Sequence, residues 1–202
     1  TLISYNAAYK VLANEGATIT TDNKGIHVQN ADWVNVFLAA ATNFDATKAG
    51  CKSGETIAQL EAKVQERLVA ATAKDYETLY NDHVAKFSSY MNRADLNIAD
   101  ACTNKTTEQL VQYYNANAEN KKTADAYYLE SLYFQYGRYM TVAANLDGSI
   151  HAPSNLQGIW NDRSNTDFWH CDIHADINVE MNYWPADPTN LSEMHLPFLY
   201  NI

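Results

Sequence analysis

Apolar and polar residues alternate along the first part of the chain, a pattern that predicts strands. Residues 17–21 alternate, Asp22-Asn23-Lys24-Gly25 supplies turn residues, and residues 26–29 alternate again. The apolar run WVNVFLAAA at residues 33–41 has the length and composition of a buried strand. We therefore predict that residues 1–48 form the end of an antiparallel β-sandwich.

After Gly50 the spacing of apolar residues changes to three or four, which predicts helices. Ser53 is the predicted N-cap of the first helix, and a second helix is predicted to begin at Asp75. An alternating stretch within residues 87–98 predicts one more strand. Residues 49–122 are thus predicted to form a helical linker with one returning strand. The apolar positions of its first helix are Ile57, Leu60, Val64 and Leu68.

Two further helices are predicted in the second half of the chain. The shorter covers residues 106–114, where Thr106 and Gln109 have the spacing of a capping box. The longer covers residues 123–145 and begins a helical domain at residues 123–202, so the predicted fold class is α+β. Its apolar residues share one face: Leu129, Leu132, Tyr133, Tyr136, Met140 and Ala143.

The composition is that of a folded chain with an acidic surface. Of the 202 residues, 47% are hydrophobic and 19% are charged, and the formal net charge is −10. No cluster of Lys and Arg occurs, which argues against a nucleic-acid partner. No apolar run is long enough for a membrane span, and the three Cys residues form no CxxC pair. Both ends of the sequence lie inside predicted elements, so we expect an internal piece of a longer polypeptide.

Residues 149–187 differ in kind, because Asn, Asp, His and Trp are interleaved there with few periodic signals. A long irregular segment of this sort is usually a functional loop. Asn, Asp and His supply the donors and acceptors that sugar hydroxyls require, and Trp rings stack on sugar C–H faces. Glycoside hydrolysis also needs an acid and a group that activates water or attacks carbon, and the segment contains candidates for each.

His174, Asp176 and Asn178 alternate, so an extended chain would direct all three to one face. Polar groups that converge in this way suggest a ligand, because burying them without partners is costly. A buried polar network that only holds two helices together explains the same pattern equally well. The pattern by itself leaves these two interpretations open.

Metal binding is a third interpretation of the same segment. Alternating His and Asp side chains, with two more carboxylates nearby, include ligands that zinc or calcium accept. The spacing matches no standard zinc pattern and no EF-hand loop, so we predict no metal and no cofactor. The residues concerned are Asp162, Asp167, His170, Asp172, His174 and Asp176.

The segment SNLQGIWND, followed by DIHADINVEMNYWPADPTNLSE, resembles the signature of glycoside hydrolase family 95. That family comprises inverting α-L-fucosidases and relatives that act on α-L-galactosides. The preceding text YYLESLYFQYGRYM, and the stretches at residues 30–45 and 86–99, match the expected order less specifically. The resemblance therefore covers most of the chain, and residues 155–193 carry its specific part.

The resemblance implies an N-terminal β-sandwich, a helical linker and an (α/α)6 barrel. This chain would contain the end of the sandwich, the whole linker and the first helices of the barrel. The sugar-contacting His of the family falls on His174, and two Asn that orient the attacking water fall on Asp176 and Asn178. Trp160, Asn161 and Trp184 are the further predicted substrate contacts. The catalytic acid Glu and base Asp are expected outside this chain.

One departure matters, because Asp176 stands where the family has Asn. An Asp there takes the proton itself or shifts the pKa of the distant base. Glu180 and Glu193 lie close by, but the family gives them no catalytic role, so structural hydrogen bonds are expected.

The predicted function is hydrolysis, with inversion, of a terminal α-L-fucosyl or α-L-galactosyl linkage in a fucosylated oligosaccharide or glycan. The chain is expected to need the remainder of its own polypeptide and to be inactive alone. A non-catalytic carbohydrate-binding or structural fragment, and a helical-barrel glycosidase of other specificity, are the alternatives. The family favours a periplasmic or secreted location.

Overall fold

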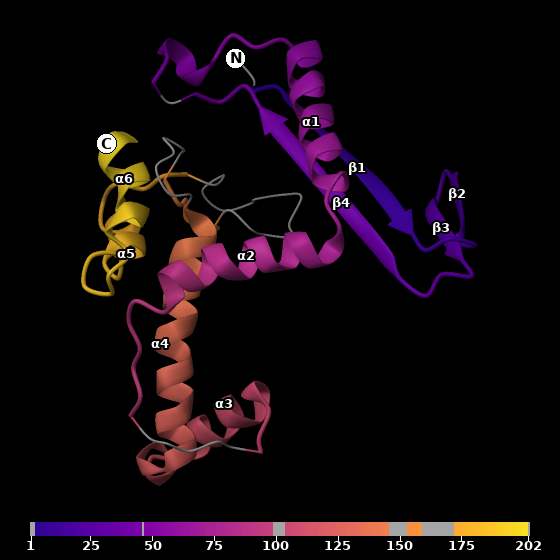
Figure 1. Cartoon of the computed structure of the whole chain (residues 1–202). Coiled ribbons are helices and arrows are strands. Elements are labelled where there is room, and N and C mark those ends of the chain that lie inside the picture. Colours follow the sequence, from indigo (N-terminus) through magenta and orange to yellow (C-terminus); the bar gives the residue numbers. More distant parts are fainter. Residues whose placement is uncertain (1–2, 46, 99–103, 146–152, 159–171, 202) are drawn as a thin grey trace. The chain divides into compact units, whose positions relative to one another are not determined.

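The computed structural model describes residues 3–45, 47–98, 104–145, 153–158 and 172–201. The chain divides into two units, Thr1–His83 and Val84–Ile202, which we describe separately. The division falls within helix α2 (Tyr76–Met91), which contributes residues to both units (Figure 1).

Four strands form two antiparallel ribbons in the first unit. Strand β1 (Tyr5–Ala13) pairs with β4 (Val34–Thr42), and β2 (Thr18–Asp22) pairs with β3 (Gly25–Gln29). The predicted hairpin is confirmed. Its turn is closed by Asp22, whose Oδ1 accepts hydrogen bonds from the backbone N–H of Lys24 at 2.7 Å and of Gly25 at 3.1 Å.

Helix α1 (Ile57–Thr72) lies along one face of the β1–β4 ribbon (Figure 1). Its apolar stripe of Leu60, Val64 and Leu68 is buried with Ala41 of β4, so these predicted helical positions are confirmed. The other face of β4 is exposed, and Val36 and Leu38 are 67% and 72% accessible. The prediction of a buried strand at residues 33–41 is therefore right about the strand and wrong about its second face.

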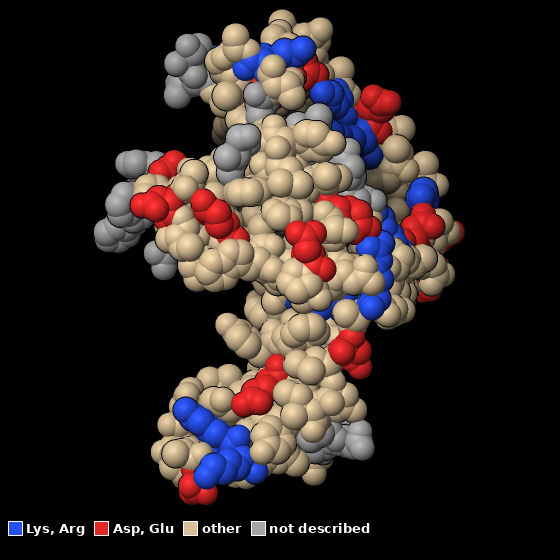
Figure 2. All heavy atoms as spheres, turned by 90° about the vertical axis from the view of Figure 1, so that its left-hand side faces the viewer, with Lys and Arg blue, Asp and Glu red and all other residues tan. Residues whose placement is uncertain are grey.

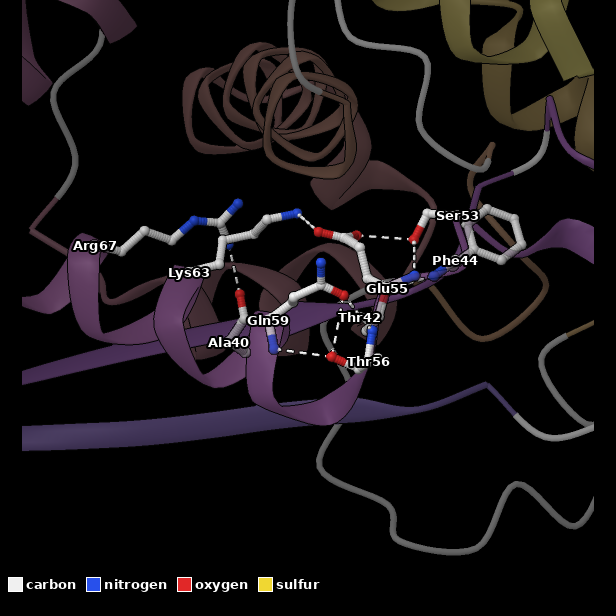
Figure 3. A network of polar contacts seen from close by, with 9 residues as sticks. All are labelled: Ala40, Thr42, Phe44, Ser53, Glu55, Thr56, Gln59, Lys63 and Arg67. Atoms are coloured by element: carbon white, nitrogen blue, oxygen red, sulfur yellow. Dashed lines mark hydrogen bonds and ion pairs between the residues drawn. The ribbon is translucent and has the colours of Figure 1, made fainter.

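The N-terminus of α1 is fixed by Thr56 rather than by Ser53, so the predicted cap is wrong. The Thr56 hydroxyl accepts a hydrogen bond from the Gln59 N–H at 3.3 Å, and the Gln59 side chain accepts one from the Thr56 N–H at 2.8 Å. Figure 3 shows this capping box beside the Lys63–Glu55 ion pair. Ser53 instead donates from its hydroxyl to the Glu55 carboxylate at 2.8 Å.

The second unit consists of helices and short 3₁₀ turns in its described part. Helix α3 (Thr107–Ala116) has the predicted capping box of Thr106 and Gln109, and α4 (Ala124–Ala144) begins at its N-cap Thr123. Two short helices follow, α5 (Asn178–Tyr183) and α6 (Leu196–Asn201). The 3₁₀ turns are η1 (Ala49–Cys51) in the first unit and η2 (Glu119–Lys122) and η4 (Ser192–His195) in the second.

The strand predicted within residues 87–98 is not formed, although the structure describes all of these residues. Helix α2 continues to Met91, and irregular chain follows it. Phe87, Tyr90 and Met91 have helical rather than alternating spacing, and they pack with Val142, Leu191 and Met194. Contact with α4 and the C-terminal segment therefore favours the helix over the local alternation.

Helix α4 is as long as predicted, but it buries a different face from the one expected. Tyr133, Tyr136 and Met140 are exposed among the described residues, whereas Arg138, Thr141 and Val142 are buried. Within the described residues the predicted apolar stripe is therefore only partly covered, with Leu129, Leu132 and Ala143 half-buried.

Arg138 is the largest fully buried side chain of the structure, with 1% exposure. Its Nη1 donates to the carbonyl oxygens of Met91 at 2.8 Å and Ala94 at 2.6 Å, and its Nη2 donates to Tyr90 O at 2.8 Å. Burial lowers the pKa of this guanidinium, yet an Arg keeps its charge in proteins. The cation therefore satisfies carbonyls at the C-terminus of α2, where the helix dipole is negative.

Thr56→Ala should lower the free energy of unfolding by about 1 kcal/mol, because the backbone N–H of Gln59 in the first turn of α1 loses its side-chain acceptor. Urea denaturation of the 202-residue chain measures the change. Ser53→Ala is the matched control, and it should cost less than about 0.5 kcal/mol. Equal losses for the two variants would contradict the assignment of Thr56 as the cap.

Arg138→Met should destabilise the second unit by about 3–5 kcal/mol, because several buried carbonyls would lose a charged donor. Thermal unfolding followed by circular dichroism gives the measurement. Arg93→Met serves as the control, because Arg93 is a partly exposed member of an ion pair with Glu193 and should cost at most about 1 kcal/mol. A loss at Arg138 no larger than at Arg93 would refute the role of the buried guanidinium.

Candidate active site

Three segments of the second unit meet at the C-terminal end of α4: residues 153–158, residues 172–177 and helix α5. Side chains of α4, of residues 154–158 and of α5 line a hollow of about 540 Å³, a size within the range of small-ligand pockets. Its polar lining comes from Asn145, Ser154, Asn155, Gln157 and Asn182, and Tyr133 and Met181 add apolar surface. Amides beside apolar groups are the chemistry that recognises a polyhydroxylated ligand.

Asp172 holds the imidazole of His174. The Nδ1 atom of His174 lies 2.7 Å from Oδ2 of Asp172. A carboxylate can only accept, so Nδ1–H donates this hydrogen bond and the imidazole carries its proton on Nδ1. The backbone carbonyl of Asp172 also binds the segment at residues 153–158, because the Leu156 N–H donates to Asp172 O at 3.1 Å. The signature segment at residues 154–158 and the predicted sugar-contacting His174 are therefore joined through one residue.

The chain turns sharply between Asp176 and Asn178. Residues 175–177 form a turn, and α5 begins at Asn178, so the extended chain on which the alternation argument depends is absent here. Ile177 has φ +79° and ψ −33°, which is strained for a β-branched residue. Such strain costs about 1–3 kcal/mol and is found mostly at functional sites.

Asn178 shares a face of α5 with two residues that line the hollow, although Asn178 itself does not line it. Met181 and Asn182, which line it, follow Asn178 by three and four positions and so share its helical face. His174 is partly buried, whereas Asp176 and Asn178 are both exposed. The three residues thus flank the turn that starts α5, and none of them is among the residues that line the hollow.

The remaining predicted site residues have different outcomes. Trp184 follows α5 and is 59% exposed, and it does not contribute to the lining of the hollow. Trp160 and Asn161 lie outside the described residues. Glu193 forms the expected structural contact as an ion pair with Arg93. Glu180 lies on α5, and its buried Oε2 has no hydrogen-bond partner among the described residues, so the structural hydrogen bond expected of it is not seen at this atom.

Tyr183 and Asn145 form a buried polar junction that the sequence did not reveal. The Tyr183 hydroxyl donates to Asn145 Oδ1 at 2.7 Å and accepts from the Ser154 N–H at 2.9 Å. Burial raises the pKa of Tyr183, since the phenolate would lose its solvation. The only sequence signal was the place of Tyr183 within MNYWP, where a tyrosine is more often an ordinary core residue.

Charge is dispersed around these segments rather than gathered for a metal or a polyanion. No group of three or more potential ligand side chains that could hold a metal occurs among the described residues, and Asp162, Asp167 and His170 lie outside them. The face drawn in Figure 2 is mostly uncharged, with acidic and basic side chains scattered over it. None of the described helices has the length and apolarity needed to cross a bilayer.

Comparison with known proteins agrees with the signature segment and places the chain in a family of glycoside hydrolases. A sequence model of the glycosyl hydrolase family 95 catalytic domain matches residues 75–202. The chain therefore belongs to glycoside hydrolase family 95. The matched part includes all of α4, His174, Asp176 and the α5 segment.

Three curated relatives have similar sequences. Alpha-L-fucosidase 2 of Arabidopsis thaliana is 31% identical over 92% of this chain, and probable alpha-fucosidase A of Aspergillus oryzae is 32% identical over 87%. Probable alpha-fucosidase A of Aspergillus niger is 31% identical over 96% of the chain. The chain spans only 21–24% of the length of these proteins.

Ile177→Gly should cost less stability than Ile173→Gly, by about 1–3 kcal/mol, because glycine relieves a positive φ only at position 177. The two isoleucines are matched in type, and both are exposed. Urea denaturation of both variants measures the difference. Equal losses would show that residue 177 carries no strain.

Proposed function

We propose that the intact protein hydrolyses a terminal α-L-fucosyl or α-L-galactosyl linkage with inversion of configuration. The observation that carries the proposal is the family 95 match over residues 75–202, supported by relatives named as fucosidases. The amide-lined hollow and the oriented imidazole of His174 suit a neutral ligand rich in hydroxyl groups.

In the proposed reaction His174 hydrogen-bonds a sugar hydroxyl, and Asp172 keeps its ring in one orientation. Asn178 and Asp176 orient the attacking water from either side of the strained Ile177. A carboxylic acid supplied from outside these 202 residues protonates the leaving oxygen, and a distant carboxylate acts as the base. Inversion requires about 6.5–9.5 Å between those two carboxyl groups, so that water fits between them.

The proposed architecture is the end of a β-sandwich (residues 1–48), a linker (49–122) and the first helices of an (α/α)6 barrel (123–202). Two exposed apolar faces support it. Tyr9 and Leu38 are opposite each other on the uncovered face of the β1–β4 ribbon, and Tyr133 and Tyr136 project from α4. A second sheet and further helices would bury these faces, each buried side chain contributing about 1.5–3 kcal/mol.

The full-length protein should release β-L-fucose first from an α-L-fucoside, because inversion changes the anomeric configuration. Proton NMR during the first minutes of hydrolysis distinguishes the two anomers. The 202-residue chain alone should show almost no turnover, because in this proposal it lacks the acid, which is worth about 10²–10⁴ in rate. It should also not bind L-fucose, because it holds only part of the proposed barrel pocket. Initial release of α-L-fucose would contradict inversion, and affinity of the isolated chain for L-fucose would favour a non-catalytic carbohydrate-binding module.

Asp176→Asn should move the acidic limb of the pH–rate profile to lower pH. In the proposed reaction the carboxylate at position 176 and the base act on the same water, so their repulsion raises the pKa of the base, and the neutral amide removes this repulsion. The profile of kcat/KM against pH for α-L-fucoside and α-L-galactoside substrates provides the measurement. Asp82→Asn, which removes an exposed carboxylate of the first unit, is the control. Unchanged rate, specificity and pH profile would show that Asp176 does not act on the water or the base.

A further inference from the structure

The hydroxyl of Tyr183 is held more firmly than packing alone would require. Tyr183 is 2% exposed and Asn145 is 5% exposed, and their side chains are hydrogen-bonded at 2.7 Å. The ring of Tyr183 stacks on His195, with 5.6 Å between centroids and 11° between planes, and it also contacts Phe198 at 5.3 Å. Phenylalanine would fill the same space without the cost of burying a hydroxyl, so the polar group needs a reason of its own.

The Tyr183 hydroxyl joins the ends of three segments. Asn145 is the C-cap of α4 and Tyr183 is the last residue of α5. The third partner is Ser154, whose N–H donates to the phenol oxygen at 2.9 Å and begins the segment that lines the hollow. Asn145 is itself fixed, because its Nδ2 donates to Thr141 O at 2.8 Å.

From Ser154 the contacts lead on to His174. Leu156 lies two residues further along and donates from its N–H to Asp172 O at 3.1 Å. The Asp172 carboxylate then accepts from Nδ1 of His174 at 2.7 Å. A second connection runs through α5, since the Val179 N–H donates to His174 O at 2.9 Å. Two chains of hydrogen bonds therefore connect the buried phenol of Tyr183 to His174. One runs through residues 154–156 and Asp172, and the other runs through helix α5.

We propose that Tyr183 is a positioning residue of the active site: its hydroxyl holds residues 153–158 against α4 and α5 and, through Leu156 and Asp172, sets the orientation of His174. The catalytic part of this proposal rests on the proposed function, whereas its structural part does not. It assigns Tyr183 no contact with the sugar.

The structural part is tested on the 202-residue chain with Tyr183→Phe, which removes one oxygen and keeps the ring stack. Hydrogen exchange of the Ser154 and Leu156 amides, resolved by NMR, should accelerate at least about tenfold, because Ser154 loses its acceptor. Tyr200→Phe, a change at an exposed tyrosine of the same unit, should leave both amides unchanged. Unaltered exchange at Ser154 in Tyr183→Phe would overturn the proposal.

The catalytic part is tested on the full-length protein with the same variants. Tyr183→Phe should lower kcat for an α-L-fucoside about 10–100-fold at a temperature where the variant is fully folded, because small displacements of a positioned group cost large factors in rate. Tyr200→Phe should keep wild-type kcat. Loosened exchange with unchanged kcat and KM would overturn the positioning role and leave only a structural one.

Asn145→Ala provides a second test of the positioning role, because it removes the acceptor of the hydrogen bond that the Tyr183 hydroxyl donates. The double variant with Tyr183→Phe should lose much less kcat than the product of the two single losses, since both changes break one junction. Independent, multiplicative losses would overturn the proposal. A wild-type full-length protein without activity on α-L-fucosides would instead refute the proposed function, and the amide exchange would still decide whether Tyr183 holds the segment.

Discussion

The guanidinium of Arg138 lies where helix α2 ends and α4 passes beside it, and the second unit is organised around this contact. Its donors satisfy the carbonyls of Tyr90 and Met91 at the end of α2 and of Ala94 beyond it, and Tyr90 O also accepts from the Arg93 N–H at 3.3 Å. A buried cation is tolerated here because it meets the negative end of a helix dipole and several acceptors at once. The apolar contacts of α2 with α4 and the C-terminal segment gather around the same point.

Helix α4 connects the buried Arg138 to the candidate site at its C-terminal end. Asn145 follows Arg138 by about two helical turns, so a helix fixed at Arg138 presents its C-cap at a defined place. Tyr183 binds that cap, and the signature segment binds Tyr183. The remote supports of His174, Tyr183 and Asn145, are buried and hydrogen-bonded, whereas Asp172, which contacts the imidazole, is exposed, as are Asp176 and Asn178 at the turn. A rigid support beneath an accessible polar edge is what binding a hydroxyl-rich ligand requires.

The same helix exposes the aromatic stripe that the sequence marked as its core face, and β4 exposes a second apolar face in the first unit. Contiguous apolar faces on a protein surface usually mark a contact with another part of the protein or with a partner. They agree with a chain that spans about a fifth to a quarter of its relatives' length. The proposed sandwich and barrel would supply that partner, and the exposed stripe of α4 would then be core after all.

The sequence by itself determined the helices with strong caps and periodicity, the β2–β3 hairpin and the segment that carries the family signature. Capping boxes and turns depend on residues three or four positions apart, so they can be read locally. The family assignment also followed from local order, because SNLQGIWND and the DIHADINVEMNYWP segment are specific strings.

Only the tertiary structure decided which faces are buried and how the site is supported. Residues 87–91 became helix because Phe87 and Tyr90 pack on distant residues, and Thr56 displaced Ser53 as cap because the chain enters α1 later than the pattern suggested. Alternation predicted that His174, Asp176 and Asn178 share one face, but the strained turn at Ile177 interrupts the extended chain which that prediction assumed. The junction of Tyr183, Asn145 and Ser154 joins residues up to 38 positions apart, and no local pattern encodes a contact of that separation.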